Sequence, residues 1–394
     1  MKQSSLVLHA GFEDKASGAP VMNPLELATS FYVRPDEVGF SANSLNGTVP
    51  LVYSRWRNPT VDLLEQRMAA LEGGEAALAL ASGMAAVAGL FFYKLKAGDH
   101  LVLSNVCYAG VAELAQEILP RYGIAVTPVD TSDPARVAAA LRPETKLIHV
   151  ETPANPILRL TDIEAVAALA HSHGAALSVD STMATPVATR PIALGADYVV
   201  HSLTKYACGH GDALGGVVVG RQQDVADLHK MAAIHFGGVI SPFSAWLILR
   251  GLETLPARMA LHEANAAKVT AFLQNHPRVK KAWWPGSESH PQYALARKQM
   301  RNFSGMVSFS ADDGEALAGR IAERITLFSY AVSLGKTRSL IFYIPTDDLL
   351  RTSFHLEGDE AEAYRAWTGE GTFRLSVGLE DADELIADLD QALS

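Results

Sequence analysis

The stretch DYVVHSLTKYACGHGDALGGVVVG, residues 197–220, decides the fold. It opens with DYVVHS and closes with GGVVVG, and each run has an apolar centre, YVV in the first and VVV in the second. Such runs are typical of strands that are buried on both faces of a sheet covered by helices. Lys205 follows the first run, where burial disfavours the charged form of an amine. We therefore expect Lys205 either to pair with a carboxylate or to be used as an amine.

Similar short apolar runs occur upstream, through the middle of the chain. Helical patterns that begin at an acid or a proline, such as DIEAVAALAHSHG and PARVAAALRP, separate the apolar runs. The alternation predicts an α/β domain with a mostly parallel sheet of seven strands. Its further strands are LALAS, HLVLSN, AVTPVD, KLIHVET and ALSVDST.

The pattern changes near Ser241, which predicts a smaller α/β domain at the C-terminus. Residues 241–277 read as one long helical region, followed by the strand MVSFS, a helix around ADDGEALAGRIAER and a final strand and helix. We expect an N-terminal arm over 1–60, a large domain over 61–250 and a C-terminal domain over 251–394. The arm lacks clear periodicity and is expected to lie on another surface, such as a neighbouring subunit in an oligomer.

Composition indicates a globular enzyme that does not bind nucleic acid. Apolar residues make up 48% of the 394 residues, and the formal net charge is −10 with a pI near 5.7. A protein that binds a phosphate backbone would normally present a basic face. Two cysteines, Cys107 and Cys208, indicate a reducing compartment, although one disulfide between them is possible. The N-terminus resembles neither a signal nor a transit peptide, so we expect a cytoplasmic protein.

Residues 76–93, AALALASGMAAVAGLFFY, are apolar enough to raise the question of a membrane span. Ser82 and Gly83 interrupt the run. We therefore expect a buried strand, a tight turn and a buried helix rather than a membrane helix.

Asp180 ends the apolar run LSVD that precedes the Lys205 strand. Neighbouring parallel strands place Asp180 and Lys205 at the same edge of the sheet, where open α/β sheets bind ligands. The two residues can form a structural ion pair. They also match the needs of an aldehyde cofactor, since an amine forms a Schiff base and a carboxylate keeps a pyridine nitrogen protonated. The second interpretation predicts pyridoxal 5′-phosphate.

Other residues suit the remaining parts of this cofactor and its substrate. Ser202 and Thr204 offer hydroxyl groups, and the turn Ser82-Gly83-Met84 would offer free N–H groups at a helix start, both suited to a phosphate. Tyr108 is a candidate to stack on the ring, or else an ordinary core or surface aromatic. Arg374 interrupts an apolar strand and suits either a substrate carboxylate or a buried ion pair.

The chain resembles the Cys/Met-metabolism family of pyridoxal-phosphate enzymes, which includes cystathionine γ-synthase, cystathionine lyases and methionine γ-lyase. The resemblance covers nearly the whole chain and implies the fold of type I pyridoxal-phosphate enzymes. The motifs that carry it are YSRWRNPT at 53–60, LEGGEAALALASGMAA at 71–86, ETPANP at 151–156, VDST at 179–182, HSLTKYACGHGD at 201–212 and RLSVGLED at 374–381.

The resemblance implies a role for each matching residue. Lys205 would form the internal aldimine, Asp180 would bind the pyridinium nitrogen and Tyr108 would stack on the ring. The phosphate would be held by Gly83, Met84, Ser202 and Thr204, with Tyr53 and Arg55 reaching it from the adjacent subunit. Asn155 would lie near the cofactor hydroxyl and the substrate carboxylate, which Ser333 and Arg374 would bind. The implied assembly is a homotetramer, a dimer of dimers with shared active sites.

The implied reaction is γ-elimination or γ-replacement on a γ-substituted L-amino acid. Lys205 would move the Cα proton, and Tyr108 would act as acid or base at the leaving group. Plausible substrates are O-acyl-homoserines, methionine or homocysteine, and canavanine. One alternative is β-elimination from cystathionine or cysteine. Another is a non-catalytic metal-binding or interaction protein that uses Cys208, His210 and His201, for which the spacing is poor.

Two departures from the family pattern lie beside the predicted cofactor. Ser181 stands in VDST where VDNT is usual. In CYAGV, Cys107 precedes Tyr108, and Gly110 stands where methionine γ-lyases carry a cysteine, which disfavours a strict methionine γ-lyase.

Two further departures concern the substrate. Arg338 in SLGKTRSL replaces a common glutamate, and if its side chain faces the substrate it would repel the distal ammonium of cystathionine. In IFYIPTDDLLRTSF, Asp347 and Asp348 suit a helix cap better than a cationic substrate tail. The insert EVGFSANSLNGTVPL at 37–51 is a further candidate to line the neighbouring site.

Overall fold

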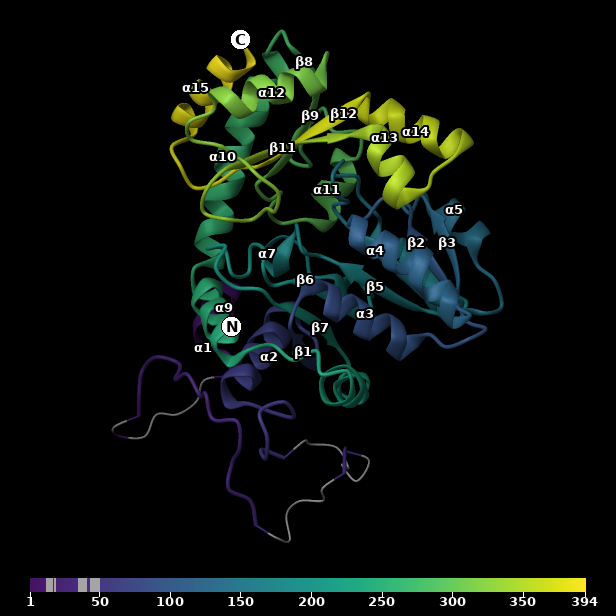
Figure 1. Cartoon of the computed structure of the whole chain (residues 1–394), viewed down its shortest axis with the longest axis vertical. Helices are drawn as coiled ribbons and strands as arrows, with labels where there is room; N and C mark the ends of the chain where they lie inside the picture. The colour runs from purple at the N-terminus through teal and green to yellow at the C-terminus, as the bar shows by residue number, and fades with distance from the viewer. Residues whose placement is uncertain (12–16, 18, 35–40, 43–49) are drawn as a thin grey trace.

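Two sheets and the helices around them make up the chain in this computed structural model, which describes residues 1–11, 17, 19–34, 41–42 and 50–394. The larger sheet occupies the lower half of Figure 1 and the smaller one the top. Helices α9 (Pro242–Glu253) and α10 (Leu255–Asn275) run up one side between them.

The larger sheet has seven strands in the order β1-β7-β6-β5-β4-β2-β3. Strands β3, β2, β4, β5 and β6 pair in parallel, whereas β7 runs antiparallel between β6 and β1. The prediction of an α/β fold with a mostly parallel sheet of seven strands is therefore confirmed. The strands are β1 (Ala76–Leu80), β2 (His100–Ser104), β3 (Ala125–Val129), β4 (Thr145–Glu151), β5 (Ala176–Asp180), β6 (Tyr198–Ser202) and β7 (Gly216–Gly220).

Helices cover both faces of this sheet, which explains why its strands are apolar throughout. On one face, Leu64 and Met68 of α2 (Pro59–Glu72) pack with Val199 and Val217. On the other face, Leu90 and the rest of α3 (Gly83–Lys94) cover residues such as Val218. Further helices are α4 (Ala109–Glu113), α5 (Pro134–Ala140), α6 (Ile163–Ser172), α7 (Thr185–Ala188) and α8 (Gln222–Leu228), with π-helical turns at Leu114–Ile118 and His229–His235 and 3₁₀ turns at Leu119–Tyr122 and Pro191–Leu194.

The smaller sheet has five strands in the order β10-β11-β12-β9-β8. Its core packs Phe309 and Phe373 in a stacked pair against α10, α12 and the last helix, α15. The strands are β8 (Val279–Trp283), β9 (Met306–Ala311), β10 (Ser329–Tyr330), β11 (Leu340–Pro345) and β12 (Gly371–Ser376). The helices are α11 (Tyr293–Gln299), α12 (Gly314–Arg324), α13 (Thr346–Leu349), a π-helical turn at Leu350–Phe354, α14 (Gly358–Thr368) and α15 (Ala382–Leu393).

The helical region predicted over 241–277 is two helices rather than one. Helix α9 ends at Glu253, and α10 begins at Leu255. Pro256 explains the break, because proline has no N–H to donate to the carbonyl four residues earlier and its ring clashes with that turn.

Residues 76–93 form β1 and then α3, as the sequence predicts, although the break falls at Ala81 and Ser82 and Gly83 is already the first residue of the helix. Within the described residues, no helix has both the length and the apolar character needed to cross a bilayer.

The N-terminal segment is more ordered than its sequence predicts. Helix α1 (Gln3–His9) buries Val7 against α2, and the Gln3 amide donates to the carbonyl of Pro186. Trp246 also donates its indole N–H to the carbonyl of Asn23 at 3.0 Å. Parts of the arm therefore pack on the body of their own chain. Most of the insert at 37–51 lies outside the described residues.

Candidate active site

A cleft of about 210 Å³ lies at the carboxyl edge of the larger sheet. Strands β4, β5 and β6 end there at Glu151, Asp180 and Ser202, and α3 begins there. The lining residues are Ser82, Gly83, Met84, Val87, Tyr108, Val111, Glu151, Asn155, Asp180, Thr182, Met183, Ser202, Thr204, Lys205, Leu214 and Leu334. The cleft thus gathers residues that are up to about 250 positions apart in the sequence.

The Lys205 amine lies in this cleft and donates to the Ser333 hydroxyl at 3.2 Å. Burial lowers the pKa of Lys205, and the positive charges of Arg374 and Lys336 lower it further, while Asp180 opposes the shift. A lowered pKa increases the share of the neutral amine, which is the nucleophilic form. Lys205 is therefore suited to attack an aldehyde.

The Asp180 carboxylate lies in the same cleft and is almost completely buried. One of its oxygens accepts the Thr182 N–H at 2.9 Å. Burial raises the pKa of Asp180, whereas Thr182, His201 and Lys205 lower it. A cationic pyridinium N–H would be a suitable partner for this carboxylate, since it would supply the charge that burial otherwise makes costly.

The start of α3 provides a place for a dianion. Ser82 caps this helix, and its hydroxyl accepts the Ala85 N–H at 3.1 Å. The N–H groups of Gly83 and Met84 belong to the first turn, have no partner within the helix and border the cleft. A Cβ on Gly83 would come within 2.8 Å of the Cβ of Ser202, so this close approach requires glycine. These features fit a phosphate group.

Thr204 and Tyr108 also border the cleft, as predicted. The Thr204 hydroxyl exchanges hydrogen bonds with the backbone of Gly215, accepting its N–H at 3.1 Å. Tyr108 stands at the N-terminus of α4 with 50% of its surface exposed. A Cβ on Gly110 would lie 3.0 Å from its ring, so the small residue in CYAGV makes room for Tyr108. Cys107 is buried in the core.

Arg374 connects the two sheets at the cleft. It lies in β12, is nearly buried and donates to the Asn155 side chain at 2.9 Å and to the Ser333 carbonyl at 3.0 Å. Ser333 also accepts from Lys205, so one segment joins the amine to the guanidinium. Burial lowers the pKa of Arg374, and the Glu151 carboxyl opposes that shift. A substrate carboxylate would match this guanidinium.

The family described as Cys/Met metabolism PLP-dependent enzyme matches residues 4–394. The chain belongs to this family. Its cofactor is pyridoxal 5′-phosphate, so the predicted family, cofactor and enzyme class are confirmed.

Relatives match over nearly the full length of the chain. It is 40% identical to canavanine gamma-lyase of Pseudomonas canavaninivorans, over 100% of this chain and 96% of the relative. It is 39% identical to L-methionine gamma-lyase of Fusobacterium nucleatum subsp. nucleatum, over 100% and 99%. Among solved structures, metB from Corynebacterium glutamicum superposes with a TM-score of 0.89 at 38% identity, over 100% of this chain and 98% of that chain.

Glu151 is a cleft residue of this PLP enzyme that the sequence did not single out. Its carboxylate accepts the backbone N–H of Asn155 at 2.8 Å and that of Tyr108 at 2.5 Å. Burial raises the pKa of Glu151 well above its ordinary range, and the nearby Asp180 raises it further. The signal was available, since Glu151 ends an apolar strand just as Asp180 does.

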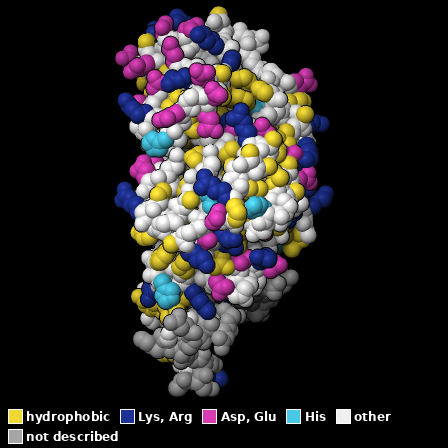
Figure 2. All heavy atoms as spheres, turned by 90° about the vertical axis from the view of Figure 1, so that its right-hand side faces the viewer, with side chains coloured by type: hydrophobic (Ala, Val, Ile, Leu, Met, Phe, Trp, Pro, Cys, Tyr) yellow, Lys and Arg dark blue, Asp and Glu magenta, His cyan; other side chains and the backbone are white. Residues whose placement is uncertain are grey.

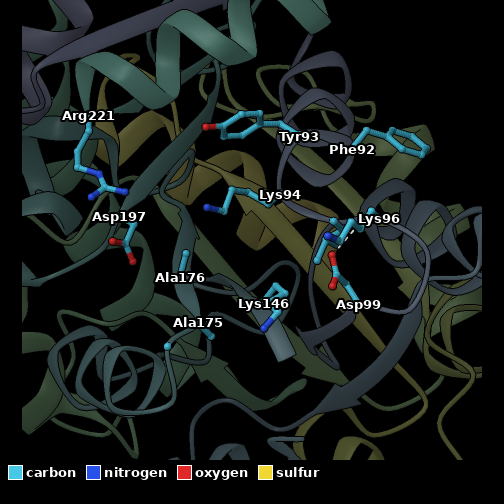
Figure 3. A pocket seen from close by; sticks show the side chains of 12 residues that line it. Phe92, Tyr93, Lys94, Lys96, Asp99, Lys146, Ala175, Ala176, Asp197 and Arg221 are labelled. Carbon is cyan, nitrogen blue, oxygen red and sulfur yellow. Dashed lines mark hydrogen bonds between the residues drawn. The ribbon is translucent and has the colours of Figure 1, made fainter. Parts of the chain in front are cut away.

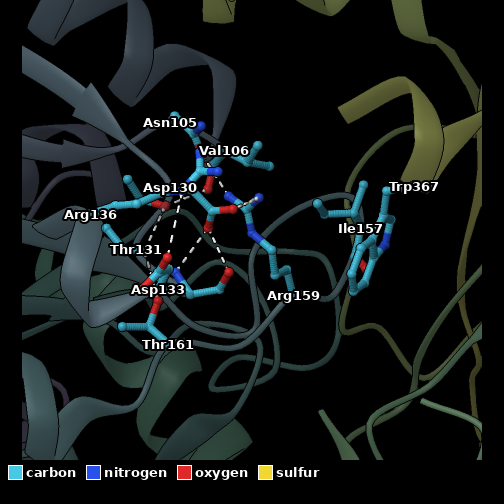
Figure 4. Close-up of polar contacts among 12 residues, drawn as sticks. Asn105, Val106, Asp130, Thr131, Asp133, Arg136, Ile157, Arg159, Thr161 and Trp367 are labelled. Carbon is cyan, nitrogen blue, oxygen red and sulfur yellow. Dashed lines mark hydrogen bonds and ion pairs between the residues drawn. The ribbon is translucent and has the colours of Figure 1, made fainter. Parts of the chain in front are cut away.

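A second polar network holds the loops beside the cleft (Figure 4). Arg159 contacts Asp130 at 3.0 Å and donates to the Asn105 side chain at 2.6 Å. Asn105 lies just before Tyr108, and Arg159 lies just after Asn155. The Trp367 indole donates to the Ile157 carbonyl at 3.1 Å and so brings α14 against the same loop. These contacts fix the two loops relative to each other.

Several predicted site residues lie away from the cleft as the described residues form it. Tyr53 is 45% exposed, with the Arg55 guanidinium 5.6 Å from its ring centroid, and Arg55 donates to the carbonyl of Ile234. Arg338 is exposed. Asp347 and Asp348 lie in the first turn of α13, where Pro345 is the N-cap, and they pair with Arg365 and Arg351.

The residues of the metal-binding alternative make other contacts. The Cys208 thiol donates to Asp212 at 3.1 Å, and His201 lies 2.6 Å from Glu72. Among the described residues, no three histidine, cysteine or acidic side chains gather as a metal site would require. Cys107 and Cys208 are both free thiols.

Proposed function

We propose that this PLP enzyme breaks the bond between Cγ and its heteroatom in γ-substituted L-amino acids, by elimination ahead of replacement. The observation that carries the proposal is the placement of Lys205 and Asp180 in one cleft, with Arg374 beside it and bonded to the cleft residue Asn155. Two full-length relatives named as γ-lyases support the same reaction class.

The cofactor supplies an electron sink that stabilises negative charge at the substrate Cα. Lys205 would anchor it, and its amine would carry protons between substrate carbons. Asp180 holds the ring nitrogen, and Gly83, Met84, Ser202 and Thr204 receive the phosphate.

The remaining residues of the cleft bind the substrate. Arg374, with Asn155 and Ser333, binds the α-carboxylate and so orients the Cα–H bond toward Lys205. Tyr108 stacks on the cofactor and handles the proton at the leaving group. Since Tyr108 is half-exposed at the mouth of the cleft, it has room to meet both ring and substrate.

The distal part of the substrate is expected to be neutral or anionic. Lys336 is near enough to lower the pKa of Lys205, and so places a positive charge beside the cleft. Asp347 and Asp348 already pair with arginines, so we do not assign a cationic tail to them. O-acyl-homoserines, methionine and homocysteine are thus preferred over canavanine and cystathionine.

We propose a homotetramer in which Tyr53 and Arg55 complete the phosphate site of an adjacent subunit. Their exposure outside their own cleft supports this arrangement. A cytoplasmic location is also proposed, and the two free thiols support a reducing compartment.

A substrate panel tests the function. The purified holoenzyme is incubated with O-acetyl- and O-succinyl-homoserine, methionine, homocysteine, canavanine, cystathionine and cysteine, and 2-oxo-acid, ammonia and homoserine are measured by mass spectrometry. We expect 2-oxobutyrate and ammonia from the first four. Release of pyruvate from cystathionine or cysteine, with no turnover of the other compounds, would favour the alternative β-lyase.

Two variants accompany the panel. Lys205→Ala is expected to abolish turnover and to change the visible absorption of the bound cofactor. Lys268→Ala is the matched control, since this lysine is exposed and pairs with Asp383 far from the cleft. A Lys205→Ala protein with wild-type activity would overturn the proposal.

A further inference from the structure

A second hollow, of about 550 Å³, lies at the opposite edge of the larger sheet from the active site (Figure 3). It is bordered by the residues that precede or begin β2, β4, β5 and β6, and by the end of α3. Its lining residues are Phe92, Tyr93, Lys94, Leu95, Lys96, Asp99, Lys146, Gly174, Ala175, Ala176, Asp197 and Arg221.

Basic side chains dominate this hollow. Lys94 and Lys96 come from the end of α3 and the loop after it, Lys146 from β4 and Arg221 from the end of β7. In Figure 3, the ends of Lys94 and Arg221 are directed to the space between them, and Lys146 lies below that space. On the face of the molecule in Figure 2, by contrast, basic and acidic side chains are interspersed.

The two acids of the hollow already have structural partners. Asp99 accepts the backbone N–H of Lys96 at 2.9 Å. Asp197 accepts the Leu177 N–H at 2.8 Å and lies 3.0 Å from His171. Both carboxylates are thereby committed to holding the backbone at the strand starts.

The three lysines of the hollow are not paired with carboxylates among the residues that the structure describes. No carboxylate of the described residues lies within ion-pair distance of Lys94, Lys96 or Lys146. The Lys94 ammonium lies 5.7 Å and 5.5 Å from the ring centroids of Tyr93 and Tyr198, which hold it over the hollow without neutralising it. Arg221 pairs through Nε with Asp224 at 2.9 Å, which orients its guanidinium.

We propose that this hollow binds a small molecule bearing a phosphate group. Clustered cations in a concave site raise the local concentration of anions, and lysines bind phosphate as point charges. The volume suits a small ligand, and the chain carries a net charge of −10, so general attraction for anions does not account for such binding. The proposal does not depend on the reaction at the other edge.

Equilibrium titration of the holoenzyme tests this site. The protein is saturated with PLP, so that the cofactor's phosphate-binding site at the start of α3 is filled. It is then titrated by calorimetry with inorganic phosphate, pyrophosphate and ATP at near-physiological ionic strength. We expect saturable binding of one phosphate-bearing probe per chain. Binding of inorganic phosphate alone would indicate a free-ion site, and preference for ATP would indicate a nucleotide.

The double variant Lys94→Gln/Lys146→Gln is expected to lower the affinity at least about tenfold, because it removes two charge-assisted contacts. Lys268→Gln is the control and should bind as the wild type does. Turnover should be unchanged in both variants, which also reports that they fold. Absence of saturable binding to the wild type, or equal affinity in the double variant, would overturn the proposal.

Discussion

Glu151 shows how much of the site depends on a residue with no direct role in the proposed chemistry. Its two oxygens hold the N–H groups of Tyr108 and Asn155, which approach the cleft from different strands. Because both donors are backbone groups, the contact fixes where each loop lies rather than how one side chain turns. We regard Glu151 as a positioning residue.

Glu151→Ala should therefore lower kcat/KM by at least about 10-fold, since two backbone N–H groups lose their acceptor at about 1–3 kcal/mol each and about 1.4 kcal/mol in the transition state is a factor of ten. Glu151→Gln keeps one acceptor oxygen and should lose less. The measurements are kcat and KM separately, together with the visible absorption of the cofactor.

Glu164→Gln is the control for this pair, because Glu164 is half-exposed on α6 and pairs with Lys298. It should leave activity unchanged. If Glu151→Ala lowered thermal stability but left kcat, KM and the absorption as in the wild type, the positioning role would be wrong.

At the scale of residues, the sequence identified charged side chains that are costly to bury and that stand at the end of an apolar strand. Lys205 and Asp180 were found in this way, and both line the cleft. Glu151 has the same signature but was read only as part of a motif. The placements of Arg338, Tyr53 and Arg55 depend on loop conformation and, in the assembly that we propose, on a neighbouring chain, and local sequence does not specify either.

At the scale of elements, the contact between β7 and the start of α3 determines the shape of the proposed phosphate-binding site at Gly83 and Met84. A Cβ on Gly216 would come within 2.1 Å of the Ser82 carbonyl oxygen, which is a backbone atom that cannot rotate away. Gly216→Ala should push the capped turn from the strand, lowering stability by about 1–3 kcal/mol and weakening PLP binding.

Thermal unfolding and cofactor titration measure both effects. Gly319→Ala in α12 is the matched control, since a Cβ there meets no atom within 4 Å, and it should raise stability by up to about 1 kcal/mol. Unchanged PLP affinity in Gly216→Ala would contradict this account of the phosphate-binding site.

The contact between α2 and the edge strand β1 should make stability depend on pH. Glu65 of α2 accepts the Ala79 N–H at 2.8 Å, and burial raises its pKa from 4.5 to about 8. The folded state then binds more protons than the unfolded state between these two values, so this group lowers stability as the pH rises through that window.

Glu65→Gln keeps an acceptor for Ala79 and carries no charge. It should therefore be more stable than the wild type at roughly pH 9, by about 1–3 kcal/mol, and differ little at roughly pH 5. Thermal unfolding at both values measures the difference. An equal gain at the two values would show that packing, not titration of Glu65, is responsible.

Elements with strong patterns were predictable, and those set by tertiary contact were not. The seven strands of the larger sheet stand out because burial on both faces leaves an unbroken apolar run. Helix α1 was missed because seven residues with a single fully buried side chain, Val7, are too few to show periodicity. The break between α9 and α10 was marked by Pro256, which was outweighed by the helical pattern on both sides.

At the scale of the whole molecule, one chain presents most of a site but leaves Tyr53 and Arg55 outside it. The closed symmetric assembly that we propose would account for such a division, since each chain would receive from its neighbour what it supplies. Sedimentation should give a tetramer of the 42.2 kDa chain.

Mixing two inactive variants tests whether the sites are shared. Lys205→Ala removes the amine, and Arg55→Ala removes the group that we assign to the neighbouring site. In a mixed pair, one site combines the intact Lys205 of one chain with the intact Arg55 of the other, and the second site carries both changes. Random mixing in equal amounts should therefore restore about a quarter of wild-type activity, because half of the pairs are mixed and each has one intact site. If Arg55 acted within its own chain, the mixture would show only the mean activity of its two parents, even where differently tagged chains copurify.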